Sequence, residues 1–201
     1  MHPAPPDPPR SSGDPRIGGL LFVAAMAALM WVVEVVDVVA GGDLDSAGIR
    51  PRDPDGLPGI AAAPFLHGGF GHLIANTVPF LLLGAAIALS GLARIVAVTV
   101  IVAVVGGLGT WLTAPAGSVT IGASGLVFGF AAYLFARGAF SRKPLHLAAG
   151  LVVLAVYGAT LLLSLVPTPG ISWQGHLFGA IGGIVAARVL DRRPAGPVVP
   201  V

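Results

Sequence analysis

The 201-residue sequence contains no cysteine, and only 10% of its residues are charged. Without cysteine the chain has no disulfide, no thiolate nucleophile and no cysteine-ligated metal site. Its 55% of hydrophobic residues and mean hydropathy of +0.90 are more than a soluble core absorbs. The composition therefore predicts a protein that crosses a lipid bilayer several times.

A large excess of charge of one sign is also missing, because the formal net charge is only +2. The basic residues are scattered between apolar blocks, so we expect no nucleic-acid partner despite a pI near 9.7. No His-Glu-x-x-His sequence is present, which argues against a zinc protease.

Six apolar blocks predict an all-α fold, a polytopic bundle of six transmembrane helices. The blocks lie at 17–40, 70–89, 93–113, 121–136, 145–166 and 174–190. The first block is too long for a signal-peptide core, so we expect it to be retained. The expected domains are a proline-rich cytoplasmic tail (1–16), the membrane domain (17–190) and a short cytoplasmic tail (191–201).

Lysine and arginine predict the orientation of the six spans, because cytoplasmic loops are rich in positive charge. Only Arg50 and Arg52, in the long loop 41–64, fall on one side. The other side carries Arg10, Arg16, Arg94, Arg137, Arg142, Lys143, Arg188, Arg192 and Arg193. We therefore expect both termini in the cytoplasm, the long loop outside, and a location in a bacterial plasma membrane.

The fourth block is the irregular one, because the stretch from Gly122 to Arg137 is too short for a full crossing. Irregular backbone at membrane depth needs protein or a water-filled cavity around it. We expect segment 114–120 to dip inward, so that Ser124 lies near a buried helix start.

Polar residues inside the spans gather toward the outer side. His72 and Asn76 lie four residues apart on one helix face, Ser124 lies near the start of the fourth span, and His176 near the start of the sixth. Because buried polar groups are costly in a membrane, this convergence indicates a functional site. Glu34 and Asp37 in the first span are interpreted as structural groups that face the bundle.

Small residues predict that the fourth and sixth spans pack closely. The glycines concerned are Gly125 and Gly129 on one span and Gly175, Gly179 and Gly183 on the other. His176 shares the second face and Ser124 adjoins the first. The serine hydroxyl should therefore lie within hydrogen-bond reach of the imidazole, an arrangement that activates a weak nucleophile.

Acyl transfer also requires donors for a developing oxyanion. The side chains of Asn76 and His72 and the backbone N–H of Ser124 at a helix start could supply them. No intramembrane carboxylate is placed beside His176, so we expect a Ser-His dyad.

Three motifs resemble those of the rhomboid family, in the expected order along residues 17–190. Gly122-Ala-Ser124-Gly125 resembles its GxSG motif. The stretch 67–76 resembles its second-helix motif, and Gly175-His176-Leu-Phe-Gly179 its sixth-helix motif. Together the three are far more specific than any one of them.

The resemblance implies an intramembrane serine endopeptidase that takes transmembrane proteins from the lipid bilayer and needs no cofactor or metal. It implies Ser124 as nucleophile, His176 as general base and then acid, and His72 with Asn76 as oxyanion hole. It gives His67 a supporting role, beside the motif glycines Gly122, Gly125 and Gly179. It further implies a wet cavity open to the outside and sideways substrate entry past the fifth span.

Two departures from the family pattern stand out. Phe128 occupies the place of a tyrosine that stacks on the catalytic histidine in many rhomboids, so ring packing is kept and the hydroxyl is lost. The long loop lacks the usual Trp-Arg pair and offers Gly48-Ile-Arg50-Pro-Arg52, so its anchoring should differ.

Two alternatives belong to other functional classes. One is an inactive rhomboid-like protein that binds membrane clients, against which the presence of both Ser124 and His176 argues. The other is a small-solute transporter, which the lack of an internal repeat disfavours. An aspartyl mechanism is disfavoured because Glu34 and Asp37 share one helix.

Overall fold

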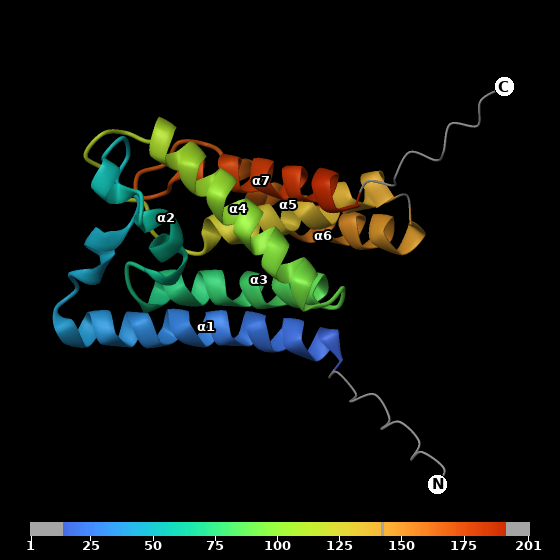
Figure 1. Ribbon diagram of the computed structural model, residues 1–201. Helices are drawn as coiled ribbons and strands as arrows, with labels where there is room; N and C mark the ends of the chain where they lie inside the picture. The colour runs from blue at the N-terminus through green and yellow to red at the C-terminus, as the bar shows by residue number, and fades with distance from the viewer. Residues whose placement is uncertain (1–13, 142, 192–201) are drawn as a thin grey trace, which may run out of the picture.

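The computed structural model describes residues 14–141 and 143–191, and apart from two isolated β-bridges its regular secondary structure is helical (Figure 1). In chain order the helices, with η for 3₁₀ turns, are α1 (Pro15–Ala40), η1 (Leu44–Ala47), η2 (Pro54–Gly56), α2 (Gly59–Ala62), η3 (Ala63–Phe65), α3 (Phe70–Ala88), α4 (Leu92–Thr113), α5 (Ser124–Ser141), α6 (Pro144–Leu163) and α7 (Trp173–Asp191). The predicted all-α fold is confirmed. Most of both predicted tails lies outside the described residues, as do Arg10, Arg142, Arg192 and Arg193.

Each of the six predicted apolar blocks is a helix. Helices α1, α3, α4 and α5 are long and apolar enough to cross a membrane, which makes the chain a multi-pass membrane protein. Helix α6 offers a shorter apolar run, 144–160. Helix α7 is less apolar because it carries Gln174, His176, Arg188 and Asp191.

Helix α5 lies at the centre of the bundle, where it contacts α3, α4, α6 and α7 (Figure 1). Its Phe130 is fully buried against Phe80 of α3, with ring centroids 5.6 Å apart. Figure 1 also shows that α1 extends farther toward the loop-bearing end than α5 does. The first residue of α5, Ser124, therefore lies inside the bundle.

The predicted end of α5 was wrong, because the helix continues beyond residue 136 to Ser141. The physical reason is a polar cluster that holds its last turns. Asp191 of α7 accepts a hydrogen bond from the Tyr133 hydroxyl at 2.7 Å and pairs with Arg137 at 3.2 Å and Arg94 at 3.3 Å. Arg137 also donates to the Ser90 hydroxyl at 2.9 Å. Thus α4, α5 and α7 meet at one carboxylate, and Ser90 joins the cluster through Arg137.

The long loop 41–64 is folded, which its Gly-, Pro- and Asp-rich sequence did not predict. Arg52 donates to the carbonyls of Leu112 at 3.0 Å and Ala114 at 2.9 Å, at the end of α4. In return the Trp111 indole donates to the carbonyl of Asp53 at 2.9 Å. A tryptophan and an arginine therefore do anchor this loop, but the tryptophan comes from α4.

We expect Asp191→Ala to lower the free energy of unfolding by about 3–5 kcal/mol, because two guanidinium groups and a hydroxyl lose a buried acceptor. The Asp191 side chain is only 5% exposed. Thermal unfolding in detergent measures the change.

The matched control is Arg50→Ala, which removes the exposed Arg50–Asp53 pair of 2.7 Å. Exposed pairs contribute only about 0–1 kcal/mol. Equal losses for the two variants would contradict the role given to Asp191.

Candidate active site

Ser124 and His176 lie together although 52 residues separate them in the chain. Ser124 begins α5, His176 lies in the first turn of α7, and the distance from Ser124 Oγ to His176 Nε2 is 3.0 Å. His176 Nδ1 lies 3.0 Å from the carbonyl oxygen of Ser164. Because a carbonyl only accepts, Nδ1 carries the proton and Nε2 is free to accept from the serine hydroxyl.

The two helices meet through glycine, as the sequence predicted. A Cβ atom added at Gly179 would overlap the carbonyl of Gly125, and one added at Gly183 would overlap the carbonyl of Gly129. The predicted small-residue contact between the fourth and sixth spans is therefore confirmed. It sets the separation of α5 and α7, and with it the distance between hydroxyl and imidazole.

Phe128 lies one turn beyond Ser124 and stacks on the His176 ring. The ring centroids are 4.0 Å apart and the planes differ by 6°. Both residues are buried. Together with the Ser164 carbonyl, this contact leaves the imidazole a single orientation.

The side chains of His72 and Asn76 on α3 lie beside Gly122, two residues before Ser124. A Cβ at Gly122 would lie 2.8 Å from His72 Nε2 and 3.9 Å from Asn76 Nδ2, and the φ of +106° also requires glycine there. The N–H of Gly68 lies 3.4 Å from His72 Nδ1, which leaves a proton on Nε2. Asn76 Nδ2 donates to the His72 carbonyl at 3.0 Å and keeps its second hydrogen free.

His67 contacts the backbone of Ala123, the residue before Ser124. It is 1% exposed, and its Nε2 accepts from the N–H of Ala123 at 3.4 Å. Burial, with a smaller contribution from His72, lowers the pKa of His67 to about 4. His67 is therefore neutral at physiological pH and able to accept this hydrogen bond.

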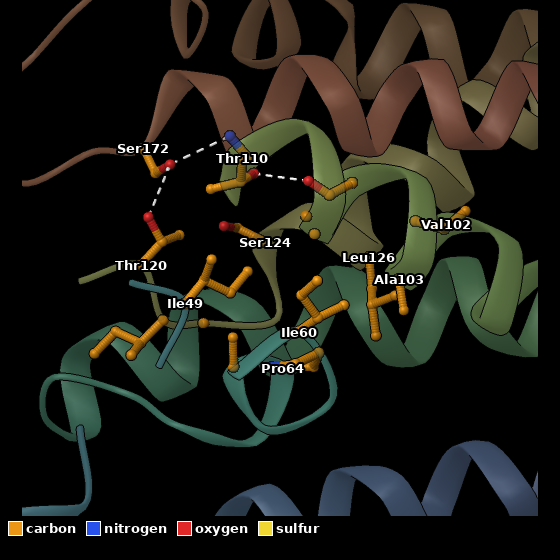
Figure 2. A pocket seen from close by; sticks show the side chains of 17 residues that line it. Ile49, Ile60, Pro64, Val102, Ala103, Thr110, Thr120, Ser124, Leu126 and Ser172 are labelled. Carbon is orange, nitrogen blue, oxygen red and sulfur yellow. Dashed lines mark hydrogen bonds between the residues drawn. The ribbon is translucent and has the colours of Figure 1, made fainter. Parts of the chain in front are cut away.

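A small cavity of about 50 Å³ adjoins Ser124 (Figure 2). Figure 2 shows Thr110, Thr120 and Ser172 around it, with apolar side chains such as Ile60 on the other side. A larger cavity of about 780 Å³ is lined by His72 and by the loops 114–121 and 167–174. Water therefore has space beside Ser124 and beside His72.

Several of these groups were not predicted from sequence. The carbonyl of Ser164 is a backbone acceptor, and Thr110, Thr120 and Ser172 reach the cavity from helix ends and loops. Within the described ranges, no group of three or more histidine or acidic side chains is placed to bind a metal ion.

Residues 56–193 match the rhomboid domain. The chain belongs to the rhomboid family. This rhomboid is 47% identical over 184 residues to the uncharacterized protein Rv1337 of Mycobacterium tuberculosis, covering 87% of this chain and 76% of that protein. It is 44% identical to the uncharacterized protein ML1171 of Mycobacterium leprae, over 87% of this chain and 72% of that one.

A more distant rhomboid relative is YdcA of Bacillus subtilis, which its name proposes to be a rhomboid protease. The two are 32% identical over 176 residues, which is 82% of this chain and 84% of YdcA. The family resemblance read from the three motifs is thereby confirmed.

We expect Gly179→Ala to destabilise the protein by about 1–3 kcal/mol, because the new methyl group overlaps the backbone of α5. Gly18→Ala is the control, since its Cβ would meet only the Leu92 side chain at 3.5 Å, an ordinary contact. Melting temperatures of the two variants in detergent measure the difference. A Gly179→Ala protein as stable as Gly18→Ala would contradict the close contact.

Proposed function

We propose that this rhomboid is an intramembrane serine endopeptidase that uses Ser124 and His176 as a dyad. The observation that carries the proposal is the 3.0 Å distance between Ser124 Oγ and His176 Nε2, with Nδ1 occupied by a backbone carbonyl. A hydroxyl in contact with a correctly oriented base is what a serine nucleophile requires. Family membership supports the same reaction class.

The reaction has two halves. Ser124 Oγ attacks the scissile carbonyl carbon while His176 Nε2 takes the hydroxyl proton, and His176 then gives this proton to the leaving amine. The carboxyl half of the substrate departs, and an ester on Ser124 remains. A water molecule, deprotonated by His176, hydrolyses that ester and restores the serine. The cavities beside Ser124 and His72 offer a route for this water.

The oxyanion of each tetrahedral intermediate is stabilised by donors around Gly122. Asn76 contributes its free amide hydrogen, His72 its Nε2–H, and Ser124 its backbone N–H at the start of α5. His67 acts indirectly, because it holds the backbone of Ala123 next to the nucleophile.

The membrane arrangement we propose has six spans, α1, α3, α4, α5, α6 and α7, with both termini in the cytoplasm. The larger cavity then opens toward the outside, as a hydrolase needs. The substrates are transmembrane helices that enter sideways from the lipid past α6, and a plasma membrane is the expected location. Residues 17–190 form the catalytic domain, between two short tails.

We predict that the protein in liposomes cleaves a labelled transmembrane substrate and that Ser124→Ala and His176→Ala both abolish cleavage. The products are identified by mass. Ser118→Ala is the matched control, because its hydroxyl lies in a loop and donates only to the carbonyl of Pro115.

The same experiment separates the other functional classes. A parent protein that binds the substrate without cutting it would be an inactive client-binding rhomboid. Solute uptake into the liposomes that persists in Ser124→Ala would indicate a transporter. Either result, or undiminished cleavage by Ser124→Ala, contradicts the proposal.

A second prediction concerns the oxyanion. Asn76→Ala should lower kcat by about 10²–10³ with little change in KM, as loss of one oxyanion donor does in other serine proteases. The neighbouring Thr77→Ala is the control, because Thr77 accepts from Trp31 of α1 on another face of α3. Full kcat in Asn76→Ala would remove Asn76 from the mechanism.

A further inference from the structure

Helix α6 packs closely on α5 in its first half and separates from it toward its C-terminal end. A Cβ at Gly150 would lie 3.0 Å from the Cα of Phe135 in α5, so the two backbones touch there. Two turns later, a Cβ at Gly158 would meet only the Leu154 side chain of α6 itself. The close contact with α5 therefore ends before the last turn of α6.

The last turn of α6 has one hydrogen bond to another part of the protein. Leu162 and Leu163 are 70% and 71% exposed, so apolar packing holds this turn weakly. Among the described residues, the hydrogen bonds of segment 159–166 join neighbours in the chain, with one exception. The carbonyl of Ser164, the C-cap residue of α6, lies 3.0 Å from His176 Nδ1 in α7.

This contact determines which nitrogen of His176 carries the proton. The stacked ring of Phe128 sets the plane of the imidazole but does not distinguish its two nitrogens. A carbonyl oxygen only accepts, so Ser164 keeps the proton on Nδ1 and leaves the Nε2 lone pair 3.0 Å from Ser124 Oγ.

In serine proteases with a catalytic triad, a carboxylate has this task. Replacing that carboxylate by an amide leaves the wrong tautomer and lowers kcat by about 10⁴. In the part of the chain that the structure describes, the hydrogen-bond partners of the His176 ring are the Ser164 carbonyl and the Ser124 hydroxyl. The end of α6 thus occupies the place of the third catalytic group.

We infer that Ser164 is a positioning residue for the catalytic base: its carbonyl fixes the tautomer of His176, and the imidazole in turn holds the end of α6 at α7. The dyad is therefore in working order only while the end of α6 lies against α7. The inference rests on the proposed protease function for its kinetic consequence only. Ser164 acts through the imidazole and does not contact the serine hydroxyl.

The first test turns the Ser164 carbonyl without replacing Ser164. A residue that precedes proline is driven out of the α region, and Ser164 has φ −76° and ψ −3°. Leu165→Pro should therefore rotate the Ser164 carbonyl away from His176. Leu165→Ala is the matched control, because it shortens the same side chain without this constraint on the backbone.

Two readouts follow the change. The nitrogen NMR signals of His176, identified by their absence in His176→Ala, should show the Nδ1–H tautomer alone in the parent and a mixture in Leu165→Pro. In liposomes, Leu165→Pro should lower kcat about tenfold or more with little change in KM, because a protonated Nε2 cannot take the serine proton. Leu165→Ala should match the parent in both readouts.

The second test measures the same contact from the side of α6, since coupling between two groups is reciprocal. His176→Ala removes the partner of the Ser164 carbonyl, so hydrogen exchange at 159–166 should become about threefold to tenfold faster. Ser124→Ala is the matched control, because it removes the other partner of His176 and leaves Nδ1 with Ser164. Its exchange at 159–166 should equal that of the parent.

Two results would overturn the inference. One is a single Nδ1–H tautomer with parent kcat in Leu165→Pro, and the other is equal exchange at 159–166 in His176→Ala and Ser124→Ala. If Leu165→Pro does not fold, the exchange comparison decides. A parent protein without Ser124-dependent cleavage would defeat the proposed function instead, and the tautomer and exchange measurements, which need no turnover, would still test the contact.

Discussion

The backbone contact between α5 and α7 is the constraint on which the rest of the structure depends. Gly179 and Gly183 lie against the carbonyls of Gly125 and Gly129, where no side chain fits. Since Ser124 begins α5 and His176 lies in the first turn of α7, the helix separation fixes the distance between the serine hydroxyl and the imidazole. At the opposite end the Asp191 cluster ties α7 to α4 and α5, so both ends of the pair are restrained.

Each of these polar side chains of the site forms a hydrogen bond with a backbone group. Polar groups are tolerated in a membrane interior when they are paired in this way. His176 faces the carbonyl of Ser164, Asn76 donates to the carbonyl of its own helix, and His67 accepts from Ala123. These contacts leave a lone pair on His176 Nε2 and one amide hydrogen of Asn76 free. The folded loop, fixed to α4 by Arg52, covers the same region.

Sequence alone predicted the features that depend on local pattern. Long apolar blocks gave helices α1, α3, α4, α6 and α7 to within three residues, and glycine spacing gave the right helix pair. Prediction from sequence failed where contacts between distant residues determine the structure. The extension of α5 to Ser141 follows from Asp191, which lies 50 residues farther along the chain. The Ser164 carbonyl that contacts His176 is a backbone group, which leaves no mark in the sequence.

The most direct test of the account is covalent labelling of the intact protein with a fluorophosphonate, whose phosphorus is attacked by an activated serine with loss of fluoride. The account predicts one adduct, on the peptide that contains Ser124, and no adduct in His176→Ala. Equal labelling with and without His176, or labelling of a different serine, would contradict it.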